Sequence, residues 1–325
     1  MDWRALPKVE LHLHLDCSLS YEVVSRIDPS ITQDDYRARF VAPRKCRDLS
    51  EFLACAPVSF PLMQTAENLR LVTLDLFDQL AADGAIYAEI RFAPTLHTEG
   101  GLSPRQVVAA VDAAVAEGIA ATGVEARIIL CALKYRTAAE SMEVVRLVEA
   151  FAGTHVVAFD VAADKPGNVI DDHVPSYAYA REHGLHHTAH AGETRGVGHV
   201  WETVRAFDPP RIGHGVSSIQ DPALVALLID SGTHLEACPV CNVQTDCYET
   251  LADHPVDRLH RAGVSIGLNT DARALVGTTL TDTYTRMHET FGWEPADFAA
   301  CNRHALAAAF VDEATRERLW RRLAA

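Results

Sequence analysis

Short apolar runs recur along the chain, and each has the length and composition typical of a buried β-strand. The runs are separated by longer segments in which apolar positions are spaced as on an amphipathic helix. Eight strands are predicted: Val9–Leu15, Ile86–Phe92, Ala126–Leu133, Val156–Val161, His186–His190, Arg211–His214, Thr233–Ala237 and Ser265–Asn269.

The intervening segments predict helices, and several of them are followed by glycine, the usual helix stop. Strands that alternate with helices indicate parallel pairing with crossover helices. Eight such repeats predict an α/β fold, a closed (β/α)₈ or TIM barrel. The predicted helices include Ala66–Ala82, Pro104–Ala121, Ala139–Ala152, Pro222–Ile229 and Val256–Ala262.

Two segments lie outside this repeat. Tyr21–Thr65 is too long for one βα connection, so we expect an insertion after the first strand that covers the barrel mouth. It carries a helical piece, Leu49–Ala56, and several helix-breaking prolines. The tail, Thr281–Ala325, predicts one or more extra C-terminal helices. Residues 1–325 show no linker or low-complexity tract, which favours a single domain.

Composition narrows the possible functions. The formal net charge of −15 argues against a nucleic-acid partner, because such binding depends on neutralising phosphates with Lys and Arg. The start of the chain lacks a signal-peptide core, and no apolar run approaches the roughly 20 residues that span a bilayer. We therefore expect a soluble cytoplasmic protein without a membrane partner, whose eight cysteines are reduced.

Residues that bind metals and move protons stand at the ends of four predicted strands. His12, His14 and Asp16 alternate along the first strand and therefore share one face. His190 ends the fifth strand, with Glu193 three residues later. The remaining two are His214, which ends the sixth strand, and Asp271, which follows the eighth.

Each of these residues also has an ordinary explanation, such as a buried histidine bonded to backbone or an aspartate that caps a helix. Their joint placement favours chemistry, because the active sites of TIM barrels lie at the carboxyl ends of the strands. Imidazoles and a carboxylate suit Zn²⁺ or a similar divalent ion, with a position left for water. The sequence thus predicts a metal-dependent hydrolase.

A second metal-like motif, Cys238-Pro239-Val240-Cys241, follows His234 and Glu236. It superficially matches the zinc signature of cytidine deaminases, but its two halves abut where that signature needs a gap. We instead predict that these residues support the seventh strand, with Glu236 near His214. Inside the barrel, Glu89 and Arg91 share a strand face and are expected to pair.

Five segments, in order and across nearly the whole chain, resemble the adenosine deaminase family, the purine branch of the amidohydrolase-type barrels. They are PKVELHLHLD (7–16), HAGE (190–193), RIGHGV (211–216), EACPVCNVQT (236–245) and LNTD (268–271). The resemblance implies hydrolytic deamination of adenosine or 2′-deoxyadenosine to inosine or 2′-deoxyinosine and ammonia, through a zinc-activated water. The implied partner is a small purine nucleoside.

The resemblance also assigns roles to residues. It implies one zinc per chain on His12, His14, His190 and Asp271. Glu193 is the implied proton donor to the purine ring, and His214 the residue that orients and helps deprotonate the water. For the substrate, it implies that His14 and Asp16 contact the ligand, with Asp16 on the ribose 5′-hydroxyl, and that the backbone N–H of Ala163 meets the purine.

The chain departs from the family pattern at three positions. Ala272 stands where a polar residue usually contacts N7 of the base, Cys17 where a glycine is common, and Ala163 where a glycine usually stands. These departures affect the substrate rather than the reaction. Alternatives are therefore a modified adenine compound (aminodeoxyfutalosine, methylthioadenosine or free adenine), an inactive metal-bound binding protein, or a hydrolase of a cyclic amide or lactone.

Overall fold

The computed structural model describes residues 2–163, 170–193 and 196–324. All strand pairs within its two sheets are parallel, with the order β1-β2-β3-β4-β5 in one sheet and β6-β7-β8-β9 in the other. The strands are β1 (Lys8–His14), β2 (Ala85–Phe92), β3 (Glu125–Leu133), β4 (Val156–Ala162), β5 (His186–His187), β6 (Ala189–Ala191), β7 (Arg211–His214), β8 (His234–Ala237) and β9 (Ile266–Leu268).

Backbone hydrogen bonds join the two sheets at both of their free edges. At one edge, the N–H of Thr188 donates to the carbonyl of Phe159 on β4, at 3.0 Å. At the other, the N–H of His14 donates to the carbonyl of Asp271 at 2.7 Å, and the N–H of Asp271 donates to the carbonyl of His12 at 3.1 Å. The expected α/β barrel is confirmed, and these bonds set β6 beside β4 and β9 beside β1.

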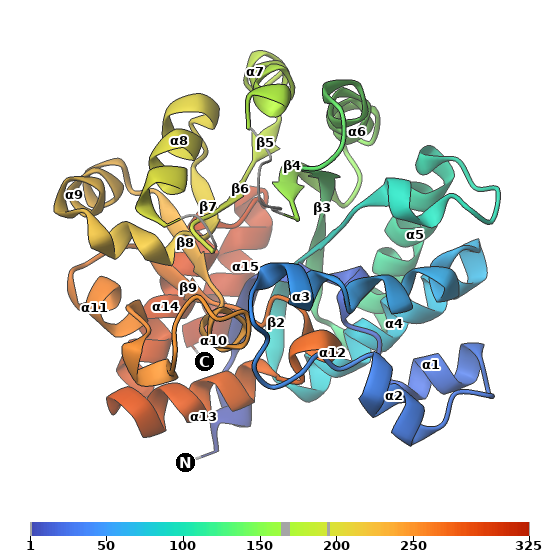
Figure 1. Cartoon of the computed structure of the whole chain (residues 1–325), viewed down its shortest axis with the longest axis horizontal. Helices are drawn as coiled ribbons and strands as arrows, with labels where there is room; N and C mark the ends of the chain where they lie inside the picture. The colour runs from blue at the N-terminus through green and yellow to red at the C-terminus, as the bar shows by residue number, and fades with distance from the viewer. Residues whose placement is uncertain (1, 164–169, 194–195, 325) are drawn as a thin grey trace.

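Helices surround the strands, as Figure 1 shows for α5 to α9. Apolar helix faces pack on the outer side of the sheets, in two clusters that include Leu76 and Ile128 in the first half of the chain and Leu228 and Ile266 in the second. The helices between strands are α4 (Ala66–Ala82), α5 (Pro104–Thr122), α6 (Ala138–Ala150), α7 (Val174–Glu182), α8 (Val197–Phe207), α9 (Pro222–Ser231), α10 (Pro239–Gln244) and α11 (Val256–Arg261).

The insertion after β1 contains three helices, α1 (Tyr21–Ile27), α2 (Gln33–Arg39) and α3 (Leu49–Leu53). The helix predicted over Leu49–Ala56 ends early, at Leu53, and a 3₁₀ turn follows at Ala56–Val58. Pro57 explains the break, because it lacks an N–H and disfavours helical geometry in the residue before it. In Figure 1 the part of this insertion around α3 passes in front of the barrel, while α1 and α2 lie to one side of it.

The C-terminal tail adds α13 (Leu280–Phe291), α14 (Pro295–Ala308) and α15 (Glu313–Ala324), after the short α12 (Arg273–Val276). Helix α14 packs on β9, β1 and β8. Among the described residues, no helix combines the length and the apolar character that a membrane crossing requires.

Candidate active site

The strand pattern of β1 delivers the first group of site residues. His12 is completely buried, His14 is partly buried and Asp16 is 4% exposed. Their leucine neighbours, Leu11, Leu13 and Leu15, are also fully buried, but within the apolar packing. The alternation predicted from the sequence is confirmed for His12 and His14 on β1. The strand ends at His14, and Asp16 lies in the following 3₁₀ turn, Leu15–Cys17, from which it lines the same pocket as His14.

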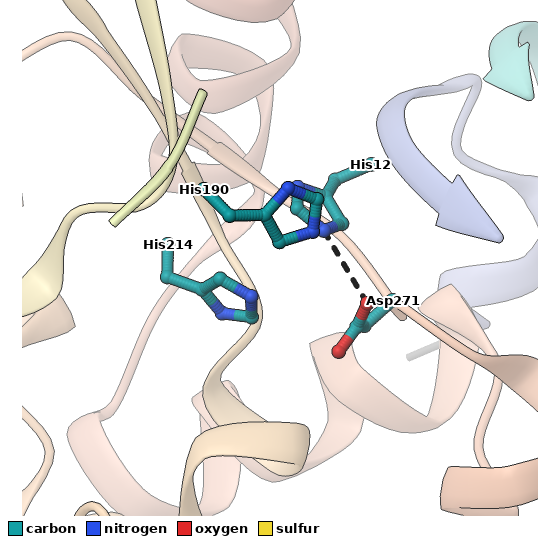
Figure 2. Close-up of side chains that lie close together, drawn as sticks. All are labelled: His12, His190, His214 and Asp271. Carbon is teal, nitrogen blue, oxygen red and sulfur yellow. Dashed lines mark ion pairs between the residues drawn. The ribbon is translucent and has the colours of Figure 1, made fainter. Parts of the chain in front are cut away.

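The other predicted ligands converge on the same place from distant strands. Nε2 of His12 lies 3.3 Å from Oδ1 of Asp271, and Nε2 of His14 lies 3.4 Å from that same oxygen. Nε2 of His14 is also 3.2 Å from Nε2 of His190. One ligand atom from each of His12, His190, His214 and Asp271 lies within 4.8 Å of the others. Figure 2 shows these four side chains close together.

These four side chains have the chemistry of a cation site. The Nε2 atoms of His12 and His214 are buried, and neither makes a well-aligned hydrogen bond within the described part of the chain. The nearest acidic groups are Asp271, 3.3 Å from Nε2 of His12, and Glu193, 3.2 Å from Nε2 of His214, so both nitrogens face carboxylate oxygens that a cation could share. Imidazole nitrogens together with a carboxylate are the donor set that zinc and similar divalent ions prefer.

Carboxylates inside the barrel orient two of the imidazoles. Nδ1 of His12 lies 2.8 Å from Oε2 of Glu236, and Nδ1 of His190 lies 3.0 Å from Oδ2 of Asp160. The hydrogen bond at His12 favours the tautomer that carries its proton on Nδ1 and leaves Nε2 free for a cation, and the close carboxylate at His190 orients that ring in the same way. Burial, together with the charge of Arg91, lowers the pKa of His12 to about 3, so its ring is neutral at physiological pH.

Arg91 links the two orienting carboxylates. Its Nη1 donates to Oδ2 of Asp160 at 2.7 Å, and its Nη2 donates to Oε2 of Glu236 at 2.6 Å, with all three side chains completely buried. Arg211 donates to the other oxygen of Glu236 at 2.8 Å. Burial opposes ionisation of Glu236, but the two guanidinium groups hold its pKa well below the usual value.

His214 is held from a different direction. Its Nδ1 lies 3.1 Å from Nδ2 of Asn242 on α10, and Oδ1 of Asn242 lies 3.2 Å from Nε2 of His254. On the other side of the ring, Nε2 of His214 is 3.2 Å from Oε2 of Glu193. Glu193 is 5% exposed and lines the same pocket, so a carboxyl group and an imidazole lie in contact beside the candidate ligands.

Backbone geometry at the site is unusual. Asp271, His214 and Ala163 all have positive φ angles, of 67°, 61° and 63°. L-residues adopt this region at a cost, and such strain is concentrated at functional sites. At Gly213, a Cβ would stand 2.8 Å from Cε1 of His12, so only glycine lets β7 approach that ring.

A pocket of about 160 Å³ opens above these residues. His14, Asp16, Glu193, His214 and Asp271 form much of its polar wall. The remaining wall is mainly apolar and comes in part from the insertion, whose contributions are Leu49, Phe52, Leu53, Ala56, Pro57 and Phe60. Cys17, Ala163 and Ala272, where the chain departs from the family pattern, also line it.

Two predicted contacts are wrong. Glu236 binds His12 instead of lying near His214, because alternate residues of β8 point across the barrel toward β1. Glu89 and Arg91 do not pair; Glu89 accepts from Arg211 at 2.5 Å, while Arg91 contacts Asp160 and Glu236. Residues two apart on a strand point the same way, but these two find closer opposite charges on other strands.

Sequence reasoning missed three residues of the site. Asp160 is a single acidic residue within an apolar strand. Because a buried carboxylate is normally paired, its position in the sequence indicates a buried partner. Asn242 stands six residues after Glu236 on a short helix and carries no motif of its own. Cys241, dismissed as part of a zinc motif, donates its thiol to Oδ2 of Asp271 at 2.8 Å.

The chain matches proteins of known family over its whole length. Residues 7–325 match the family model described as adenosine deaminase. An adenosine deaminase of Lacticaseibacillus paracasei is 34% identical over 323 residues, which cover 97% of this chain and 94% of the relative.

Two solved structures share the fold. An adenine deaminase from Arthrobacter aurescens superimposes with a TM-score of 0.90 at 24% identity, covering 98% of both chains. A zinc-bound amidohydrolase from Burkhoderia ambifaria has a TM-score of 0.90 at 22% identity, covering 99% of this chain and 90% of that chain. The family match and the closer relative in sequence agree on one assignment, and the chain belongs to the adenosine deaminase family.

Proposed function

We propose that this protein hydrolyses the exocyclic amine of adenosine and 2′-deoxyadenosine, giving inosine or 2′-deoxyinosine and ammonia. One observation carries the proposal: buried imidazoles, a carboxylate and the Glu193–His214 pair meet at the floor of an otherwise mainly apolar pocket. A planar, uncharged base fits an apolar wall, and the polar floor supplies acid, base and metal ligands.

Within this proposal, His12, His14, His190 and Asp271 would hold a zinc ion. His214 also lies within reach of the cluster, and its second role is given below. A zinc ion bound there supplies Lewis-acid activation of water, lowering the barrier to losing its proton.

The protein side chains handle the protons. His214 and Asp271 are placed to accept a proton from the attacking water as its oxygen adds to the amino-bearing carbon. That addition breaks the aromaticity of the ring and places negative charge on the neighbouring ring nitrogen. Glu193, in its neutral form, donates a proton to this nitrogen. The amino group then receives the proton taken from the water and leaves as ammonia, while the added hydroxyl returns its own proton to Glu193 and becomes the carbonyl of the product. General acid catalysis of this kind contributes about 10²–10⁴-fold.

Substrate contacts complete the proposal. Asp16 is a buried carboxylate in the pocket wall, suited to accept a hydrogen bond from a hydroxyl of the substrate, the 5′-hydroxyl in adenosine. His14 lies beside it, with its Nδ1 4.0 Å from Oδ1 of Asp16. Ala163 lines the pocket with φ 63°, and its N–H is the proposed donor to the purine.

The test is ammonia release from a panel of adenine compounds. Adenosine, 2′-deoxyadenosine, adenine, methylthioadenosine and AMP are each assayed with the zinc-loaded protein, after chelation, and after zinc is restored. We expect turnover of the two nucleosides that chelation abolishes and zinc restores.

Turnover confined to adenine or methylthioadenosine would show that the protein deaminates that compound and not adenosine. Binding of nucleosides without any ammonia would instead identify a metal-bound binding protein. Glu193→Gln is the matched control, because it should bind zinc like the wild type while releasing little ammonia.

A further inference from the structure

Asp16 is a buried carboxylate whose nearest N–H and imidazole partners lie beyond the ordinary hydrogen-bond distance. Its Oδ2 is 3.5 Å from the N–H nitrogen of Ala93 and 3.8 Å from Nε2 of His97. Its Oδ1 is 4.0 Å from Nδ1 of His14. Ordinary N–H···O hydrogen bonds measure about 2.7–3.2 Å, so Asp16 keeps accepting capacity toward the pocket that it lines.

His97 is the second unusual residue here. It ends a 3₁₀ turn after β2, Pro94–His97, and is completely buried. Neither ring nitrogen makes a hydrogen bond within the described part of the chain. The rings of Phe60 and Phe92 each lie 6.1 Å from its own, so the imidazole sits in apolar surroundings with Asp16 as its ion-pair partner.

His14 is less available to Asp16 than His97 is. Nε2 of His14 points into the ligand cluster, 3.2 Å from His190 and 3.4 Å from Asp271. His97 has no such second contact. Among the described residues, His97 has its one ion-pair contact with Asp16, so it is the imidazole placed to hold this carboxylate in position.

The turn that carries His97 is itself fixed from the insertion. Nε2 of Gln64 donates to the carbonyl of Leu96 at 3.0 Å and to the carbonyl of Phe60 at 2.7 Å. Phe60 lines the pocket and contacts the His97 ring edge-on. The imidazole of His97 is thus held between β2 and the part of the insertion that lines the pocket. It lies behind Asp16, where it can position the carboxylate without contacting the substrate.

We propose that His97 is a specificity-determining residue that acts through Asp16, keeping its carboxylate oriented to select substrates with a hydroxyl at the 5′ position. The inference rests on the proposed function, in which Asp16 meets the 5′-hydroxyl of adenosine. His97 is a positioning residue. A purely space-filling imidazole at the same place would support the fold but would not distinguish one substrate from another.

The experiment compares two substrates in each variant of the full-length, zinc-loaded protein. The readout is the ratio of kcat/KM for adenosine to kcat/KM for 5′-deoxyadenosine, which cancels any general loss of active enzyme. We expect His97→Leu to lower this ratio on the order of tenfold, because the carboxylate loses the buried imidazole that orients it. His97→Gln, whose side-chain amide can reach Asp16, should retain most of the preference.

Two controls make the comparison specific. His234→Leu removes an equally buried imidazole from β8, where Nδ1 lies 2.9 Å from Oγ of Ser265, and should leave the ratio unchanged. Asp16→Ala should lower the ratio at least as far as His97→Leu. If His97→Leu does not fold, His97→Asn replaces it, because its amide falls short of the Nε2 position while that of Gln matches it.

The outcomes separate the two proposals. No turnover of either nucleoside by the wild type would contradict the proposed function, and the role of His97 with it. A wild type that deaminates adenosine, with a ratio lowered by Asp16→Ala but unchanged in every His97 variant, would overturn the inference alone. A ratio insensitive to Asp16→Ala would also overturn it, because His97 would then have no carboxylate through which to act.

Discussion

Nδ1 of His12 lies 2.8 Å from Oε2 of Glu236, and both side chains are completely shielded from solvent. This contact turns Nε2 of His12 toward Asp271, 3.3 Å away. It also ties a candidate metal ligand to a charge network, since Glu236 accepts from Arg91 and Arg211 as well. Charged side chains in the interior of the barrel therefore orient a candidate metal ligand at the barrel mouth.

Glu236→Gln should weaken zinc binding about 10–100-fold, because the amide loses the charge that holds the Nδ1-protonated tautomer of His12. The measurement is zinc affinity by competition with a chromophoric chelator. Glu117→Gln, which changes an exposed carboxylate paired with Arg70, is the control and should bind zinc like the wild type. Equal affinities in both variants would show that Glu236 does not orient a ligand.

Arg91→Met should destabilise the fold by about 3–5 kcal/mol, because Asp160 and Glu236 would be left as buried, poorly compensated charges. The free energy of unfolding in urea is the measurement. Arg70→Met breaks an exposed ion pair with Glu117 and should cost no more than about 1 kcal/mol. A loss for Arg91→Met as small as that of Arg70→Met would contradict the role of Arg91 as a bridge.

Glu193→Gln should lose about 10²–10⁴-fold in kcat on adenosine while its zinc content stays at the wild-type level. The substitution keeps the shape of the side chain and removes its ability to exchange a proton with the ring nitrogen. Steady-state ammonia release and metal analysis on the same sample give both numbers. A variant with near-normal kcat would remove Glu193 from the mechanism.

Stability should fall in acid partly through His234. Burial, reinforced by the charge of Arg211, lowers the pKa of His234 from 6.5 to about 3. Between these values the unfolded chain binds one more proton than the folded chain at this residue. The free energy of unfolding therefore falls as the pH drops below 6.5, by up to about 1.4 kcal/mol per pH unit from this group.

His234→Asn keeps a hydrogen-bonding group near Ser265 but cannot take up the proton. Its unfolding free energy, measured in urea from pH 4.5 to 7.5, should depend less steeply on pH than that of the wild type. His183→Asn, which changes an exposed histidine, serves as the comparison and should follow the wild-type curve. Parallel curves for all three proteins would refute the assignment.

Local signals in the sequence were enough for the repeat of strands and helices. The predicted helix Ala66–Ala82 has the bounds observed, because its amphipathic spacing and the glycine after it are local signals. In the structure Thr65 caps its first turn by accepting from the N–H of Asn68. The strand predicted over His186–His190 forms as two, β5 and β6, because Thr188 between them bonds to Phe159 while the next residues pair with β7.

Contacts across the barrel could not be predicted in the same way. Which acid meets Arg91 depends on the register and tilt of strands far apart in the chain, and neither is encoded locally. The contact between Asn242 on α10 and His214 could not be predicted either, because it depends on where α10 packs against β7. The candidate ligands were predictable because strand ends gather at one rim, whereas the partners that orient them lie deeper.

The most direct test of the metal site is anomalous X-ray diffraction at the zinc edge from crystals of the zinc-loaded protein. We expect one strong anomalous peak per chain, marking a zinc ion about 2.0–2.2 Å from Nε2 of His12, His14 and His190 and from a carboxylate oxygen of Asp271. Anomalous signal elsewhere in the chain, with none among these four side chains, would contradict it.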